Sequence, residues 1–296
     1  MKQALKREYY GYLFVAPFFI VFFLFSLYPL LYTFYLSFSS WNGFGSPVFT
    51  GLGNYMELLH DPVFLLSLAN TLFIWVAAVI PQLGVSLVIA VVLNQSFIRG
   101  RHFFRTVYFL PNVTTAASLG LLVGFLFSWQ SGAVNHLLVD LHVIKQPINW
   151  LQNPWLARLL NSGVSVWEFW GYSLVIWIAG LQGIPTELME AARVDGGNEI
   201  KIFWHVILPL LRPIAVFQLI TSLIGGLQNF DVPYTLTDGL GGPQNSTLTS
   251  VLYLYLTGFR NYRFGYAATI SCGLFIITVV FSIIAWRITA QREVQS

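Results

Sequence analysis

The residues best suited to a specific interaction lie in a polar segment, 184–213, between two long apolar segments. It combines charged side chains with small ones, and these support the docking of a partner through ion pairs and close contact. The charged residues are Glu187, Glu190, Arg193 and Asp195, and the small ones between them are Ala191 and Ala192. A charged segment of this length cannot cross the hydrocarbon core of a bilayer, so we expect a loop on one face of a membrane protein.

Two short helices with a sharp bend between them are predicted within this loop. Thr186 is a candidate N-cap of the first helix, and Glu187 suits the positive end of its dipole. Gly196 and Gly197 are expected to end that helix, because glycine accepts a left-handed conformation at little cost. Asn198 is a candidate N-cap of the second helix. We expect the apolar face of that helix to carry Ile200, Phe203 and Ile207, and the next apolar segment to follow Pro209 and Pro213.

Two other short stretches have the chemistry that binds sugars, which stack on aromatic rings and exchange hydrogen bonds with amides and carboxylates. The stretch 167–171 reads Trp-Glu-Phe-Trp-Gly, and the stretch 228–231 reads Gln-Asn-Phe-Asp. The candidate solute-path residues are Trp167, Glu168, Trp170, Gly171, Gln228, Asn229 and Asp231. The two tryptophans equally suit a belt of aromatics at the membrane interface, whereas polar amides at the end of a span favour a cavity.

Glu168 is the one ionisable residue that falls clearly within an apolar segment. Such residues are candidates for a functional role, but a charge near the end of a span also reaches the interface readily. Contact with a solute, exposure at the outer surface and pairing with Arg158 are therefore all open for this carboxylate.

The composition indicates a protein whose solvent is largely lipid. The 296 residues are 56% hydrophobic, 17% aromatic and only 9% charged, against about 25% charged in a soluble domain. The net charge of +3 could suggest nucleic acid, but the charges sit in short loops between apolar segments, so we expect no nucleic-acid partner. With Cys272 the only cysteine, an internal disulfide and a cysteine-based metal site are excluded.

An all-α membrane protein of six transmembrane helices is predicted, because a span needs about 20 mostly apolar residues. The whole chain, 1–296, is expected to be a single transmembrane domain. Pro17, Pro29, Pro81 and Pro111 imply kinked or broken helices within the spans. The spans lie at about 10–38, 64–93, 103–129, 164–181, 210–227 and 264–288.

The basic residues set the expected orientation, since cytoplasmic loops carry an excess of Lys and Arg. With the N-terminus inside, the larger share of these residues, Arg193 and Lys201 among them, is cytoplasmic. The outside segments hold only Lys145, Arg158, Arg260 and Arg263. Both termini and the Glu190 loop are therefore expected in the cytoplasm, and the longer connections, about 39–63, 130–163 and 228–263, outside.

The polar loop resembles the EAA motif in permease subunits of binding-protein-dependent ABC importers. The family pattern is Glu-Ala-Ala, then Gly four residues after the second Ala, then an Ile-x-Leu-Pro ending. Val206 stands in the Ile position, a mild departure. The matching residues are Glu190, Ala191, Ala192, Gly196, Leu208 and Pro209. The alternative is an interfacial amphipathic loop without a partner.

The resemblance extends over nearly the whole chain and is strongest to the carbohydrate-uptake branch. Segments typical of that branch are 51–55, 99–111, 179–185 and 241–243. The chain looks like the first of the two permease subunits of the maltose and glycerol-3-phosphate systems, since residues 291–296 lack the Gly-rich tail of the second type.

The resemblance implies a multi-pass protein of a bacterial or archaeal cytoplasmic (inner) membrane that takes up a sugar, oligosaccharide or related polar solute. It also implies a homologous second permease, two ATPase subunits that carry ATP and Mg, and an extracytoplasmic solute-binding protein. The Glu190 loop would couple ATP hydrolysis to transport.

An enzyme is not expected. No Gly-x-x-x-x-Gly-Lys-Ser/Thr loop occurs, so ATP hydrolysis and its cofactors belong to another chain. The five histidines show no metal-ligand spacing, and we find no catalytic residues. Two alternatives remain: an ion-coupled secondary transporter, which predicts inverted repeats and paired acids within spans, and a membrane scaffold that transports nothing.

Overall fold

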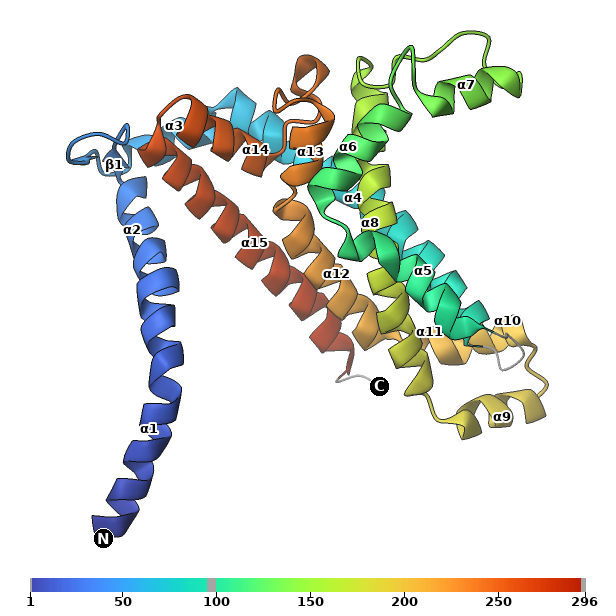
Figure 1. Ribbon diagram of the computed structural model, residues 1–296. Helices are drawn as coiled ribbons and strands as arrows, with labels where there is room; N and C mark the ends of the chain where they lie inside the picture. The colour runs from blue at the N-terminus through green and yellow to red at the C-terminus, as the bar shows by residue number, and fades with distance from the viewer. Residues whose placement is uncertain (1, 95–99, 294–296) are drawn as a thin grey trace. The chain divides into compact units, whose positions relative to one another are not determined.

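A computed structural model describes residues 2–94 and 100–293 of the chain. Arg99 of the segment 99–111 and the last three residues of the segment 291–296 lie outside this part. The described chain is mostly helical (Figure 1) and divides into two compact units, Met1–Asp61 with Leu254–Gly273 and Pro62–Tyr253 with Leu274–Ser296.

The larger unit is built on two long helices, α4 (Pro62–Leu93) and α8 (Pro154–Gln182), which pack along each other. Leu174, Trp177 and Ile178 of α8 share a buried apolar cluster with Ala90 and Leu93 of α4. The unit also contains the helices α5 (Arg101–Val113), α6 (Ala116–Leu126), α7 (Ala133–Asp140), α9 (Thr186–Val194), α10 (Glu199–Ile202), α11 (Leu208–Leu210), α12 (Arg212–Leu227) and α13 (Asp231–Leu236), a π-helical turn Phe203–Ile207, a 3-10 turn Pro243–Asn245, the start of α14 (Ser250–Tyr255) and the end of α15 (Phe264–Glu293).

The predicted span 103–129 is divided into two helices, and the break follows Pro111, one of the prolines expected to kink or break a span. Helices α5 and α6 meet at 93°. Thr114 is extended, with ψ of 145°, and the Thr115 hydroxyl accepts a hydrogen bond from the amide of Ser118 at 3.3 Å. This hydroxyl caps a new helix where the first one ends, so the chain restarts in another direction.

The fourth apolar helix begins ten residues earlier than the predicted 164, and part of the predicted connection 130–163 is therefore helical. Asn153 caps α8 by accepting hydrogen bonds from the amides of Trp155 and Leu156, and Pro154 stands in the first turn. Asn and Pro in these positions are a typical helix start. Hydropathy missed the first turns because they carry polar residues, of which Asn161 and Ser162 are buried.

The smaller unit combines the N-terminal helix with a short antiparallel strand pair, β1 (Ser39–Ser40) and β2 (Val48–Phe49), which the all-α prediction did not include. Arg263 holds Glu57 with two hydrogen bonds of 2.7 and 2.8 Å. Its helical segments are α1 (Lys2–Phe22), a π-helical turn Phe23–Leu27, α2 (Tyr28–Ser37), α3 (Gly53–His60), the end of α14 (Ser250–Tyr255), a π-helical turn Leu256–Arg260 and the start of α15 (Phe264–Glu293).

Four helical segments of the described chain are long and apolar enough to cross a membrane: Tyr12–Ser37, Pro62–Leu93, Pro154–Gln182 and Phe264–Arg287. Two bent pairs raise the number to as many as six if each counts as one span. These pairs are Phe103–Val113 with Ala116–Leu126, and Glu199–Leu210 with Arg212–Leu227 at 61°.

Candidate functional site: a polar cavity and an exposed helical loop

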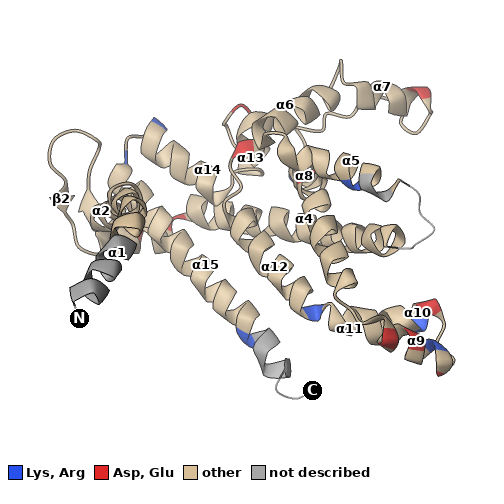
Figure 2. Ribbon diagram, turned by 60° about the horizontal axis from the view of Figure 1, so that its bottom comes forward, with Lys and Arg blue, Asp and Glu red and all other residues tan. Residues whose placement is uncertain are grey.

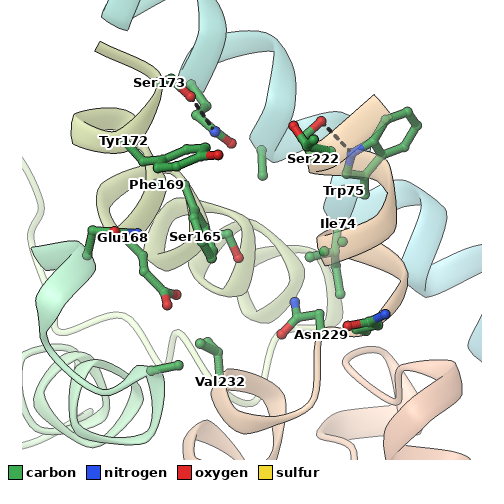
Figure 3. Close-up of a pocket in the computed structure, with 18 of the residues that line it drawn as sticks. Ile74, Trp75, Ser165, Glu168, Phe169, Tyr172, Ser173, Ser222, Asn229 and Val232 are labelled. Atoms are coloured by element: carbon green, nitrogen blue, oxygen red, sulfur yellow. Dashed lines mark hydrogen bonds between the residues drawn. The ribbon is translucent and has the colours of Figure 1, made fainter. Parts of the chain in front are cut away.

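A cavity of about 510 Å³ lies among α4, α8 and α12, within the larger unit. Its wall mixes aromatic rings, such as Trp75 and Tyr172, with amide and hydroxyl groups. Figure 3 shows Glu168 and Asn229 pointing toward the same part of the cavity. A mostly apolar cavity with a few convergent polar groups is the usual form of a small-molecule site.

The carboxyl groups of Glu168 and Asp231 both line the cavity, whereas no Lys, Arg or His among the described residues does so. Glu168 is only 9% exposed, so it does not reach the outer surface. It is not paired with Arg158, because that guanidinium donates to Asn70 and to the carbonyl of Ser246. Glu168 therefore lines the cavity, and its contact with a solute stays a prediction.

Asn229 is fixed by hydrogen bonds of both its backbone and its side chain. Its carbonyl accepts a hydrogen bond from the Thr249 hydroxyl at 2.7 Å, and its Nδ2 donates to Oδ1 of Asn161 at 3.3 Å. Asn161 is fully buried on α8, and its own Nδ2 has no hydrogen-bond partner among the described residues. The end of α12 is thereby tied to α8 beside the cavity, and Gln228, which precedes Asn229, also lines it.

Three of the predicted solute-path residues lie outside the cavity wall. Trp167 packs against the apolar cluster that includes Leu119 and Val232. Trp170 meets Tyr108 edge to face at 5.3 Å. Gly171 lies so close to the backbone carbonyl of Tyr108 that a β-carbon would collide with it. The face of α8 that carries these residues therefore contacts α5 and α6 rather than the cavity.

Several polar residues of the cavity lie outside the two stretches, 167–171 and 228–231, that were predicted from the sequence. Gln82 on α4 donates to the Ser173 hydroxyl on α8 at 2.8 Å. Trp75 Nε1 donates to the Ser222 hydroxyl at 3.3 Å. An amide between apolar neighbours, as in Phe217-Gln218-Leu219, could have indicated such residues in the sequence. Polar groups at membrane depth need a hydrogen-bond partner or a cavity. The residues in this group are Gln82, Ser165, Ser173, Gln218, Thr221 and Ser222.

The polar loop forms two short helical segments joined at Gly196, as predicted. Helix α9 ends at Val194, and Gly196 has φ of +81°, the left-handed conformation. Asn198 Oδ1 accepts from the amide of Lys201 at 2.8 Å and so caps the second helix. Two details differ: Pro185 occupies the N-cap position expected for Thr186, and no side-chain cap forms there.

The apolar face predicted for the second loop helix is also wrong in one position. Ile202 is the buried residue of α10, whereas Ile200 is 69% exposed. Ile202 lies close to Gly197, the second residue of the bend. The bend folds α10 back toward α9, which turns the side chain of residue 202 inward instead of that of residue 200.

The residues at both ends of the loop are packed in the apolar core, whereas the first helix of the loop lies at the surface. Ile184 and Leu211 belong to the buried cluster formed by α4 and α8. Helix α9 buries no residue, and Figure 2 shows acidic and basic residues on the ribbon of α9 and α10. Glu187, Glu190 and Asp195 are exposed, and Arg193 forms an exposed ion pair with Glu199 at 3.1 Å. The other motif residues, Ala191, Ala192, Leu208 and Pro209, are exposed or half-buried.

A helical membrane unit that contains a cavity with a few convergent polar groups and exposes an anchored, charged loop is typical of the permease class of transport proteins. Residues 82–290 match the family described as binding-protein-dependent transport system inner membrane component. The chain belongs to this family. The resemblance inferred from the Glu190 motif is thereby confirmed, and the family is one of transport permeases.

Curated relatives match the chain over nearly its whole length. It is 37% identical to the lactose transport system permease protein LacF of Rhizobium radiobacter, over 99% of this chain and 98% of the relative. It is 35% identical to the arabinooligosaccharides transport system permease protein AraP of Bacillus subtilis, over 94% and 88%.

A solved structure shares the fold. A chain in the crystal structure of a bacterial ABC transporter involved in the import of the acidic polysaccharide alginate matches with a TM-score of 0.82. The two sequences are 21% identical, and the match covers 98% of each chain. A second crystal structure, in which the alginate transporter is in complex with an alginate pentasaccharide-bound periplasmic protein, contains a chain with a TM-score of 0.81 at 20% identity.

Proposed function

We propose that this chain is a permease subunit of an ATP-driven importer for an uncharged sugar or oligosaccharide. The observation that carries the proposal is the cavity, in which amides and hydroxyls from three helices converge beside aromatic rings. Sugar hydroxyls both donate and accept hydrogen bonds, as do side-chain amides. The names of the lactose and arabinooligosaccharide relatives support the same substrate class.

The acidic side chains that line the cavity favour an uncharged solute over an anionic one. Glu168 and Asp231 line it, and no Lys, Arg or His of the described chain does. Like charges brought together away from water repel strongly, which discriminates against anionic solutes. In this respect the solute differs from alginate, the acidic polysaccharide named for the structural relative.

The Glu190 loop couples the permease to ATPase subunits. The two core anchors, Ile184 and Leu211, make the loop a rigid lever, and α9 presents Glu187, Glu190 and Asp195 beside the exposed apolar side chain of Val194. In this proposal the chain has six spans: the four long helical segments, the bent pair of α5 and α6, and α12, whereas Glu199–Leu210 belongs to the loop. The loop and both termini lie in the cytoplasm, where the ATPases carry ATP and Mg.

A homologous second permease and an extracytoplasmic solute-binding protein complete the importer. ATP binding must favour the outward-facing state by about 5 kcal/mol to switch the population almost completely. An ion-coupled secondary transporter is not favoured, because Glu168 is the one acid among the residues of α4, α8 and α12 that line the cavity.

The proposal is tested by isolating the tagged chain from its native membrane and reconstituting the recovered complex with its binding protein in proteoliposomes. We expect an ATPase and a second permease in fixed stoichiometry, and ATP-dependent uptake of neutral sugars but not of uronates. Recovery without an ATPase, or uptake driven by an ion gradient alone, would overturn the proposal.

A further inference from the structure

A second cavity, of about 340 Å³, lies within the smaller unit. The loop that carries β1 and β2 contributes Ser40, Asn42 and Ser46 to its lining. The turn before α15 contributes Tyr262 and Arg263. We call this cavity the Arg263 groove. Neither the coupling role of the Glu190 loop nor the solute cavity accounts for it.

The groove lies where two membrane-spanning segments end. The apolar segment Tyr12–Ser37 ends just before β1, and the apolar segment Phe264–Arg287 begins directly after Arg263. The two ends are tied together, because the Thr269 hydroxyl of α15 donates to the carbonyl of Ser37 at 2.8 Å. Figure 1 shows the strand loop beside the start of α15. The headgroup layer on each side of the hydrocarbon core is about 5–8 Å thick, so the groove lies at the depth of the lipid headgroups.

The shape of the groove is fixed by contacts within the chain. Asn54 Nδ2 donates to the carbonyls of Ser37 and Ser39, at 3.1 and 2.9 Å. The amide of Gly265 donates to the carbonyl of Trp41 at 3.2 Å. A β-carbon at Gly265 would collide with the carbonyl of Ser39, so the loop lies directly against α15. A site that is formed before its ligand arrives loses less conformational freedom on binding.

Arg263 is the charged residue of the groove, and part of its guanidinium group is unused. Nη2 donates to both carboxylate oxygens of Glu57, at 2.8 and 2.7 Å, and the group lies over the Tyr266 ring, 4.5 Å from its centroid. Nε and Nη1 donate to no atom of the described chain, and the side chain is 49% exposed. These two nitrogens form one edge of a planar fork that matches the oxygens of a phosphate.

The other groups in the groove are neutral or apolar. Ser40, Asn42 and Ser46 are exposed and offer hydroxyl and amide groups, and no Asp or Glu among the described residues lines the groove. Phe44 and Val48 also line it and are 77% and 65% exposed. Large exposed apolar side chains beside an arginine at the end of a span are typical of the membrane interface, where aromatic and basic residues anchor a protein.

We propose that the Arg263 groove binds the headgroup of an anionic phospholipid. The phosphate accepts hydrogen bonds from Nε and Nη1 of Arg263, and headgroup hydroxyls contact Asn42 and Ser46. The headgroup is of the phosphatidylglycerol type, which carries hydroxyls and no ammonium, because the groove offers no carboxylate to an ammonium group. In the orientation proposed above, this lipid belongs to the outer leaflet. The inference goes beyond solute transport and does not depend on which sugar is transported.

The test measures lipid binding by the purified complete transporter. After delipidation in detergent, the complex is titrated with dioctanoyl phosphatidylglycerol or dioctanoyl phosphatidylcholine, and bound lipids are counted by native mass spectrometry. Arg263→Gln removes the phosphate ligand. Glu57→Gln is the matched control, because it breaks the same ion pair but keeps the guanidinium group. Arg260→Gln is a second control, because Arg260 is exposed in the same unit and does not line the groove.

We expect the wild-type complex to bind phosphatidylglycerol at least fivefold more tightly than phosphatidylcholine, and Arg263→Gln to lose this preference. The two control variants should keep it. An equal loss in Glu57→Gln would trace the effect to the ion pair, and an equal loss in Arg260→Gln would trace it to general surface charge. Either result overturns the proposal, as does equal affinity of the wild-type complex for the two lipids.

Two further measurements separate a lipid from other ligands. Glycerophosphoglycerol, the deacylated headgroup, should not displace the bound lipid even in large excess, and displacement would assign the groove to a free phosphate ester instead. Ser46→Trp, which places a large ring in the groove and leaves Arg263 in place, should weaken phosphatidylglycerol binding as much as Arg263→Gln does. If Ser46→Trp stops uptake but leaves lipid binding unchanged, the groove receives a protein and the proposal fails.

Discussion

Arg158 donates a hydrogen bond from Nη2 to Oδ1 of Asn70 at 2.9 Å, although the two residues are 88 positions apart in the sequence. Nε of the same guanidinium donates to the carbonyl of Ser246 at 3.0 Å. Asn70 in turn donates from Nδ2 to the carbonyl of Asn245 at 2.7 Å. The pair thus fastens the segment before α14 to α4 and α8, and Thr249 in that segment holds Asn229.

Replacing Arg158 by alanine should loosen this segment. The buried Asn70 loses a charged donor, and a hydrogen bond to a charged group contributes about 1.5–3 kcal/mol. We expect a lower melting temperature of the purified complex and slower uptake. Arg158→Lys is the control: it keeps the charge but not the planar fork, so it should recover part of the stability. An unchanged melting temperature in Arg158→Ala contradicts this role.

Gly171→Ala should separate α5 from α8. A β-carbon at this position collides with the backbone carbonyl of Tyr108, which is not able to move independently of α5. Overpacking of this kind costs about 1–3 kcal/mol. Gly163→Ala on the same helix is the matched control, because no atom lies within 4 Å of the added carbon, and alanine in a helix should stabilise the protein slightly. Equal thermal stability of the two variants would refute the close-packing explanation.

Gly196→Val should uncouple ATP hydrolysis from uptake. The left-handed conformation, with φ of +81°, costs other residues about 1–2 kcal/mol. No atom beyond the adjacent residues lies within 4 Å of an added β-carbon, so the expected effect comes from the backbone conformation. Gly196→Asn should retain more activity, since asparagine tolerates this conformation. The measurement is the ratio of ATP hydrolysed to sugar transported, and equal ratios in the two variants would exclude a backbone cause.

Glu190→Ala should leave the subunit inserted and folded but weaken its association with the ATPase. Glu190 is exposed on α9, which buries no residue of its own. Truncating one side of a partly buried charge pair across an interface costs about 2–5 kcal/mol. Glu199→Ala is the control, because it removes only an exposed intramolecular ion pair with Arg193. Wild-type uptake in Glu190→Ala would be incompatible with the coupling role.

Asn229→Ala should weaken solute handling by about two- to tenfold, the loss of roughly one hydrogen bond. Uptake and sugar-stimulated ATPase activity are measured together in the reconstituted complex. Trp167→Phe is the comparison, because Trp167 packs in an apolar cluster beside α6 and does not line the cavity. If the two variants have the same effect on the concentration needed for half-maximal stimulation, Asn229 is not a solute contact.

The sequence was sufficient to predict the class of the protein and the design of its charged loop. Both depend on local properties: long apolar runs partition into lipid whatever they contact. Gly196 and Asn198 determine a bend and a cap through their own backbone and side-chain chemistry. Asn153 and Pro154 are also a local sequence signal for the start of α8. The prediction missed it because the first turns of this helix are too polar to be recognised by hydropathy.

Tertiary structure alone decided which residues face the cavity. Trp167 and Glu168 are neighbours in the sequence, but successive residues on a helix point in directions about 100° apart, and the packing of α6 and α13 determines which of the two is turned inward. The contacts of Arg158 with Asn70 depend on helices that are distant in the sequence. No local pattern encodes these relationships, because they arise only when α4, α8 and α12 pack together.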